Sequence, residues 1–114
     1  MKTLLNTTLL FLLVIGFSGG VSGQDVSDFE ETKRLAEQGE AYAQSDLGFM
    51  YSNGEGVPQN NVRAYIWYSV AAAQGNETAR TNRDIISERL TPDQLARGQD
   101  IATRCFESDY QDCE

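Results

Sequence analysis

The sequence predicts an all-α fold, a short right-handed α-solenoid of about five antiparallel helices. Apolar residues recur at helical spacing in five segments, and helix start and stop signals separate these segments. No segment shows the alternating apolar and polar pattern of a half-buried strand. The chain also aligns with itself at an offset of 36 residues, and a fixed period of this length is typical of helical repeat arrays.

The first segment, residues 1–23, has the composition of a secretory signal peptide. Lys2 supplies a positive charge, residues 9–17 form an apolar run, and small residues follow up to Gly23. Cleavage there would start the mature chain at Gln24. An uncleaved membrane anchor is the alternative, but a span needs about 20 apolar residues and polar residues interrupt this run near its start. We therefore expect export to the periplasm or the extracellular space, with no stable membrane insertion after cleavage.

A first helix is expected over residues 28–38. Ser27 and Glu30 have the spacing of a capping box, in which each side chain satisfies the other residue's backbone N–H. Gly39 is well placed as the left-handed residue that ends the helix. The apolar face of this segment consists of Phe29, Leu35 and Ala36.

A second helix is expected over residues 40–52. Its apolar side chains have the i, i+4, i+7, i+8 spacing of one helical face: Ala43, Leu47, Met50 and Tyr51. Residues 52–61 contain two glycines, three asparagines and one proline, so no helix is expected there. We expect Gly54 and Gly56 to take positive φ and Pro58 to stiffen the entry to the next helix.

Three further helices complete the prediction. Residues 60–74 are apolar nearly all round, as a helix packed between two others requires, and Gly75 ends them. Residues 77–89 should form a half-exposed helix. Its apolar stripe consists of Ala79, Ile85, Ile86 and Leu90. Thr91 followed by proline, aspartate and glutamine is a strong start signal for a fifth helix over residues 92–107. The apolar face of that helix consists of Leu95, Ala102, Cys105 and Phe106.

Both cysteines, Cys105 and Cys113, lie near the end of the chain. Thiols of exported proteins usually pair, and closing a loop of about nine residues should contribute about 2.5 kcal/mol to stability. Metal binding is the alternative, but structural zinc needs four nitrogen or sulfur ligands and this chain contains no histidine. We expect a disulfide that closes the tail.

The 36-residue offset relates the end of the first helix to the end of the third. It aligns Leu35, Ala36, Gln38 and Gly39 with Ala71, Ala72, Gln74 and Gly75, and Ala43 with Ala79. The register is partial, because Leu47 and Gly48 align with Arg83 and Asp84. The chain thus contains one full unit and fragments of two more.

The repeat resembles a known family. Its LGFMY segment matches the Leu-Gly-x-x-Tyr core of tetratricopeptide repeats, but their helices join through a short turn and this chain uses about eight residues. The chain more closely resembles the Sel1-like repeat proteins, whose units read LGxMYxxGxGVxxD and then AxxWYxxAAxxG. An asparagine, Asn60 or Asn61, stands where aspartate is common. The matching positions are Ala41, Ala43, Leu47, Gly48, Met50, Tyr51, Gly54, Gly56, Val57, Ala64, Trp67, Tyr68, Ala71, Ala72 and Gly75.

The resemblance implies a fold of the tetratricopeptide-like superfamily, and the end of the chain is similar to the closing helices of short exported bacterial members. We expect a signal peptide over 1–23, a capping helix over 24–38, a Sel1-like repeat over 39–75, a partial repeat and capping helix over 76–107, and a disulfide-closed tail over 108–114. Small residues should let helices approach, and aromatic residues should fill the space between layers. The predicted structural repeat core comprises Ala43, Leu47, Gly48, Tyr51, Gly54, Gly56, Ala64, Trp67, Tyr68, Ala71, Ala72 and Gly75.

Composition limits the functions open to the chain. With 17 acidic and 9 basic side chains the formal net charge is −8, which argues against nucleic acid and anionic membranes as partners. The absence of histidine excludes Ser-His-Asp and Cys-His arrangements and histidine-based metal sites. A paired-carboxylate hydrolase is formally compatible, but no spacing singles out two acidic residues. We expect no catalytic residue, no cofactor and no metal.

The family resemblance implies an adaptor or scaffold that binds another protein, because stacked helices offer an extended groove. Polar and aromatic positions of the second helix are the candidate groove: Tyr42, Gln44, Ser45 and Phe49. The alternative is a self-assembling structural envelope protein with weak self-association, since arrays usually need three or more repeats. A β-lactamase-like hydrolase, as in cysteine-rich Sel1-like proteins, is a remote alternative, because those proteins carry a cysteine pair in each repeat and this repeat has none.

Overall fold

The computed structural model of the protein describes residues 23–114, with side chains from Asp25 onward. The expected signal peptide lies outside the described residues except for Gly23, so its cleavage stays a prediction. Five helices are present, and no strand occurs among the described residues: α1 Gly23–Glu37, α2 Ala41–Asn53, α3 Asn61–Ala73, α4 Glu77–Ser87 and α5 Pro92–Glu107. The predicted all-α fold is confirmed, while the right-handed sense of the solenoid stays a prediction.

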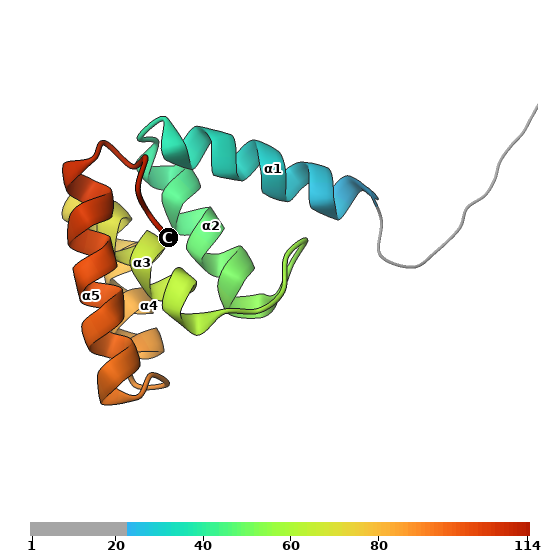
Figure 1. Cartoon of the computed structure of the whole chain (residues 1–114). Coiled ribbons are helices and arrows are strands. Elements are labelled where there is room, and N and C mark those ends of the chain that lie inside the picture. Colours follow the sequence, from blue (N-terminus) through green and yellow to red (C-terminus); the bar gives the residue numbers. More distant parts are fainter. Residues whose placement is uncertain (1–22) are drawn as a thin grey trace, which may run out of the picture.

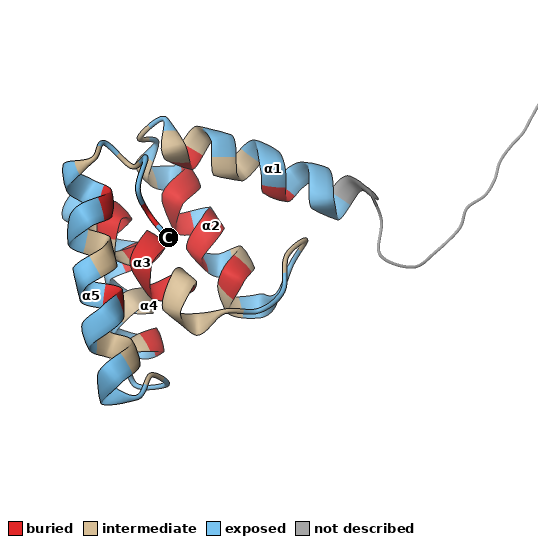
Figure 2. Cartoon of the chain, in the orientation of Figure 1, coloured by how far each residue is buried: buried red, intermediate tan, exposed pale blue. Residues whose placement is uncertain are grey.

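The helix α3 is the centre of the molecule. It packs against α2, α4 and α5, whereas α1 packs mainly against α2 at one end of the array (Figure 1). The axes of α1 and α2 diverge toward the start of α1, and the segment after α5 turns back toward the middle of the molecule. Buried residues gather on α2 and α3, while α1 and α5 expose most of their surfaces (Figure 2).

The start of α1 differs from the prediction. The helix already begins at Gly23, so Ser27 and Glu30 lie inside it on its exposed surface, and the predicted capping box is wrong as a helix start. Tertiary contacts explain the extension. The ring of Phe29 packs edge-on against Tyr51 of α2, with 5.5 Å between the ring centroids. A Cβ on Gly56 would overlap the Asp25 carbonyl oxygen, so the loop after α2 closely supports the first turns of α1.

Two glycines end helices in the same way, 36 residues apart. Gly39 has φ +95° and Gly75 has φ +99°, both in the left-handed region. The amide N–H after each glycine donates to the carbonyl oxygen five residues earlier, at 3.2 Å in the first case and 3.1 Å in the second. This pattern is the Schellman motif. Its recurrence shows that the 36-residue offset is a structural repeat as well as a sequence repeat.

The loop between α2 and α3 is also built as expected. Gly54 and Gly56 both have φ +72°, which confirms the predicted positive φ values. Within the loop, the Asn60 N–H donates to the Tyr51 carbonyl oxygen at 2.8 Å. The Asn60 side chain then caps α3 by accepting a hydrogen bond from the Arg63 N–H at 3.0 Å. The loop therefore joins the two helices through specific polar contacts.

The predicted repeat core consists of buried side chains and of glycines at turns or close contacts. The buried side chains are Ala43, Leu47, Tyr51, Ala64, Trp67, Tyr68 and Ala71; Ala72 is half-buried. A Cβ on Gly48 would lie 2.7 Å from the ring of Tyr68, so glycine permits the close approach of α2 and α3. A Cβ on Gly98 would lie 3.0 Å from the Tyr65 ring, and the sequence did not reveal this second contact, between α3 and α5.

The last two helices follow their end signals with one exception. The predicted bounds of α5 are confirmed, and Thr91 and Gln94 form a capping box with bonds of 3.0 and 3.1 Å. The helix α4 ends at Ser87, two residues before the predicted end. Ile85 in the expected apolar stripe of α4 and Phe106 on the expected apolar face of α5 are 48% and 46% exposed, so these faces are buried only in part.

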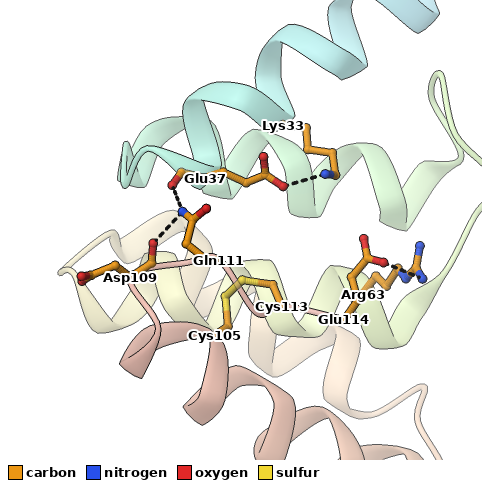
Figure 3. Close-up of polar contacts among 8 residues, drawn as sticks. All are labelled: Lys33, Glu37, Arg63, Cys105, Asp109, Gln111, Cys113 and Glu114. Atoms are coloured by element: carbon orange, nitrogen blue, oxygen red, sulfur yellow. Dashed lines mark hydrogen bonds and ion pairs between the residues drawn. A yellow bond between two sulfur atoms is a disulfide. The ribbon is translucent and has the colours of Figure 1, made fainter.

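A disulfide joins Cys105 of α5 to Cys113 of the tail, and both cysteines are buried (Figure 3). The tail reaches back to the other end of the array, where the Gln111 side-chain amide donates to the Glu37 carbonyl oxygen at 2.9 Å. A Cβ on Gly39 would lie 3.3 Å from the ring of Tyr110 in the tail. The disulfide-closed tail therefore connects the last helix to the end of the first.

Candidate protein-interaction surface

One narrow strip of α2 faces outward. The exposed residues are Tyr42, Asp46, Phe49 and Asn53, which follow the i, i+4, i+7, i+11 spacing of one helical face. Tyr42 is 75% exposed and Phe49 is 49% exposed, which places two aromatic side chains in solvent on the same strip. The strip is narrow because α2 packs against α1, α3 and α4.

Gln44 is not part of that strip. Its side chain is fully buried, and its amide nitrogen donates to the Ala36 carbonyl oxygen at 3.0 Å. Its amide oxygen accepts a hydrogen bond from Gln74 at 2.9 Å, and the same Gln74 nitrogen donates to the Gly39 carbonyl oxygen at 3.0 Å. Gln44 therefore joins the ends of α1 and α3 across the start of α2, and its assignment to a binding groove is wrong.

Ser45 is also misplaced in the predicted groove, because it is only 9% exposed. A helix turns by about 100° per residue, so Gln44 and Ser45 face inward although they lie between exposed residues in the sequence. Of the four predicted groove residues, the structure exposes Tyr42 and Phe49 together and buries Gln44 and Ser45. Polar character alone is a poor guide to the outward face of this helix.

The exposed strip continues onto α4 through the repeat. At the 36-residue offset Phe49 is equivalent to Ile85, and these two residues are 49% and 48% exposed. Asp46 is equivalent in the same way to Asn82 of α4. Equivalent residues of stacked repeats lie on the same side of a solenoid. We name this surface the α2–α4 face, formed by Tyr42, Asp46, Phe49, Asn82 and Ile85.

Polar groups lie between the apolar residues of the α2–α4 face. The hydroxyl of Tyr68 on α3 forms a hydrogen bond with Asn82. Burial raises the pKa of this hydroxyl; the bond to Asn82 lowers its pKa and the negative charge of Asp46 raises it. Partial burial also raises the pKa of the Asp46 carboxyl. The face therefore presents a partly desolvated carboxylate between exposed aromatic and aliphatic side chains.

Three of the five residues of this face were not proposed from the sequence. Asp46 and Asn82 belong to no motif, and the sequence predicts Ile85 only as part of the apolar stripe of a half-exposed helix. The available signal was the repeat offset, which relates Ile85 to Phe49 and Asn82 to Asp46.

No group of three or more acidic, cysteine or histidine side chains is placed to hold a metal ion among the residues that the structure describes. None of the described helices is long and apolar enough to cross a membrane. An arrangement of aromatic, aliphatic and acidic side chains on packed helices can recognise another molecule by contact.

Comparison with protein-family models identifies the repeat. Residues 41–76 match the model described as the Sel1 repeat. The match spans α2, the loop, α3 and the residue that caps α4. Comparisons with curated proteins and with solved structures gave no match. Both ends of the matched segment lie within two residues of the ends of the repeat expected over residues 39–75.

Proposed function

This chain is a Sel1-like repeat protein, and we propose that it acts after export as an adaptor or scaffold that binds another protein through the α2–α4 face. Sel1 repeats commonly mediate protein–protein interaction. The observation that carries the proposal is the repeated exposure of a large apolar residue, Phe49 in α2 and Ile85 in α4, at equivalent positions.

Exposed aromatic and aliphatic side chains favour contact with a partner. Burying a large apolar side chain contributes about 1.5 to 3 kcal/mol, and aromatic residues are enriched among those that dominate binding energy. Tyr42 adds a hydroxyl that remains useful at a partly wet interface. We therefore assign Tyr42 and Phe49 as the anchors of the proposed contact and Ile85 as its extension.

The partner's chemistry follows from the same face. Asp46 stands between the two aromatic anchors, and a partner that covers them would desolvate its carboxylate further. Such burial is favourable only if the partner supplies a hydrogen-bond donor or a positive charge. The net charge of −8 also favours a positively charged partner at longer range. We propose a partner segment that combines apolar side chains with a lysine, an arginine or amide donors.

Two features support export. The signal-peptide pattern of residues 1–23 is the first. The second is the Cys105–Cys113 disulfide, which is compatible with an oxidising compartment. The periplasm and the extracellular space fit these features equally.

Self-assembly by stacking of repeats is supported less well. The exposed surface of α1 is charged and includes an ion pair between Arg34 and Glu31 at 2.6 Å. A polar outer surface is typical of a capping helix, which prevents further stacking. Sedimentation tests this choice: a monomer across a wide concentration range supports the adaptor, and reversible dimers would support the alternative.

The experiment for the adaptor function compares two phenylalanines of similar exposure. Phe49→Glu changes the α2–α4 face, and Phe106→Glu changes α5, where the original side chain is 46% exposed. Each purified variant would be used to recover partners from an envelope extract of the producing cells. The proposal expects a protein recovered by the wild type and by Phe106→Glu to be lost with Phe49→Glu. Equal recovery by both variants would reject the α2–α4 face.

A further inference from the structure

A groove between α3 and α5 carries two arginine side chains, Arg63 and Arg97, and one carboxylate side chain, Glu114, on this acidic protein. We propose that it binds an acidic peptide segment, one or two carboxylates flanked by aliphatic residues, from a partner protein. The groove has a volume of about 490 Å³, within the range of ligand pockets. Its lining includes the charged residues Arg63, Arg97 and Glu114 and the apolar residues Val62, Ile66 and Ile101. We name it the Arg63–Arg97 groove.

The two guanidinium groups are available to different degrees. Arg63 lies over the Tyr51 ring, 5.8 Å from its centroid, and pairs with Glu114 at 3.4 Å. Arg97 is exposed and makes no ion pair with any residue that the structure describes, residues 25–114. Arginine presents a planar set of donors that fits a carboxylate with two parallel hydrogen bonds. Arg97 is therefore the main donor for an incoming carboxylate.

Glu114 shows that the groove accommodates a carboxylate, because its side chain reaches the Arg63 guanidinium (Figure 3). The 3.4 Å separation is long for a charge-assisted hydrogen bond, which is usually 2.7 to 2.9 Å. The main chain of Glu114 is held separately, because Arg104 donates to its carbonyl oxygen at 2.9 Å. The Glu114 side chain can therefore leave Arg63 without displacing the tail, and it acts as a built-in competitor for an acidic ligand.

The apolar residues and the helix ends complete the selectivity. Val62 and Ile101 are half-buried, so they offer contact to aliphatic side chains beside a carboxylate, whereas Ile66 is buried. The groove is lined in part by residues from the N-terminal ends of α3 and α5, where helix dipoles favour negative charge. None of its lining residues belongs to α2 or α4, so this site is separate from the α2–α4 face.

The test uses two synthetic peptides and the oxidised protein. Acetyl-Leu-Asp-Glu-Leu-amide is the acidic probe, and acetyl-Leu-Asn-Gln-Leu-amide is its uncharged control. We expect the acidic peptide to shift the amide NMR signals of Val62, Arg97 and Ile101, and the control peptide to leave them unchanged. Equal shifts with both peptides, or no shifts with the acidic peptide, would overturn the proposal.

Three single variants then separate binding from general charge effects. Arg97→Ala should weaken binding of the acidic peptide by about fivefold, the size expected for one partly exposed ionic contact. Arg89→Ala is the matched control, because Arg89 is exposed, lies outside the groove and makes no ion pair among residues 25–114. Glu114→Gln should tighten binding about twofold, because it removes the competing carboxylate. Equal losses for the two arginine variants, or weaker binding with Glu114→Gln, would contradict the proposal.

Discussion

Gln44 illustrates how a polar residue can stabilise a repeat from inside. Its amide group connects the Ala36 carbonyl oxygen to the Gln74 side chain, and Gln74 in turn reaches the Gly39 carbonyl oxygen. A buried amide is favourable only when its donors and acceptors are paired, and these contacts pair both ends of Gln44. This residue therefore fixes how α1, α2 and α3 meet.

Truncation of Gln44 should be strongly destabilising. We expect Gln44→Ala to lower the free energy of unfolding by about 2 to 4 kcal/mol, because it leaves partners unpaired and creates a cavity. Urea denaturation of the oxidised protein measures this. Gln99→Ala is the control, since Gln99 is exposed, and it should change stability by less than about 0.5 kcal/mol. Similar small losses for both variants would show that the buried amide contacts contribute little.

Asp46 should make stability depend on pH. Partial burial raises the pKa of its carboxyl in the folded state, so folding favours the protonated form. Its contribution to stability is therefore greatest below the unfolded-state pKa and falls as pH rises through the folded-state pKa. We expect Asp46→Asn to be more stable than the wild type at pH 7 and to lose this advantage at pH 3. A constant difference across that range would reject the assigned cause.

The helix ends divide into those dictated locally and those dictated by packing. Thr91 with the following proline and glutamine starts α5, and Gly39 and Gly75 end α1 and α3, as local sequence signals predicted. The start of α1 could not be predicted in this way, because Phe29 and the Asp25 backbone pack against distant parts of the chain. Tertiary contact extended this helix past an otherwise good capping box.

The candidate binding face was predicted only in part for a related reason. Residue types identified the repeat core well, since apolar and small residues at helical spacing became buried. They did not identify the surface, because Gln44 is polar and buried while Ile85 is apolar and exposed. The packing of neighbouring helices decides which residues face outward, and residue type alone does not record that packing.

The contact between α2 and α3 can be tested at Gly48. Gly48→Ala should lower stability by about 1 to 3 kcal/mol, because the new Cβ would lie 2.7 Å from the Tyr68 ring. Gly75→Ala meets nothing within 4 Å, and its φ of +99° should cost about 1 kcal/mol through the backbone alone. Near-ultraviolet circular dichroism should change in Gly48→Ala only. A change in Gly75→Ala alone would contradict this packing.

The whole molecule is an open array whose two ends are connected by the tail. The Cys105–Cys113 disulfide holds the tail on α5, and Gln111 contacts the last carbonyl of α1. Two non-glycine residues of the tail, Asp109 and Tyr110, have left-handed φ values of +54° and +67°. Such conformations persist only where surrounding contacts impose them. The disulfide and the Gln111–Glu37 hydrogen bond are among the contacts that hold the tail in this conformation.

Removal of the disulfide should loosen the array. The double variant Cys105→Ser and Cys113→Ser should lose about 2.5 kcal/mol of stability through the larger entropy of its unfolded chain. Amide hydrogen exchange should also become faster at the end of α1 and in the tail, where Gln111 contacts Glu37. Unchanged stability and exchange would show that the tail is held by its other contacts.

The central claim is that the α2–α4 face contacts another protein in the producing cell. Site-specific photo-crosslinking tests this claim most directly, with p-benzoylphenylalanine placed at position 49 in one protein and at position 106 in another. Both positions carry a phenylalanine that is nearly half exposed, so access of the probe is matched. The proposed function predicts a discrete crosslinked partner at position 49 and none at position 106. The same products at both positions, or none at position 49, would contradict it.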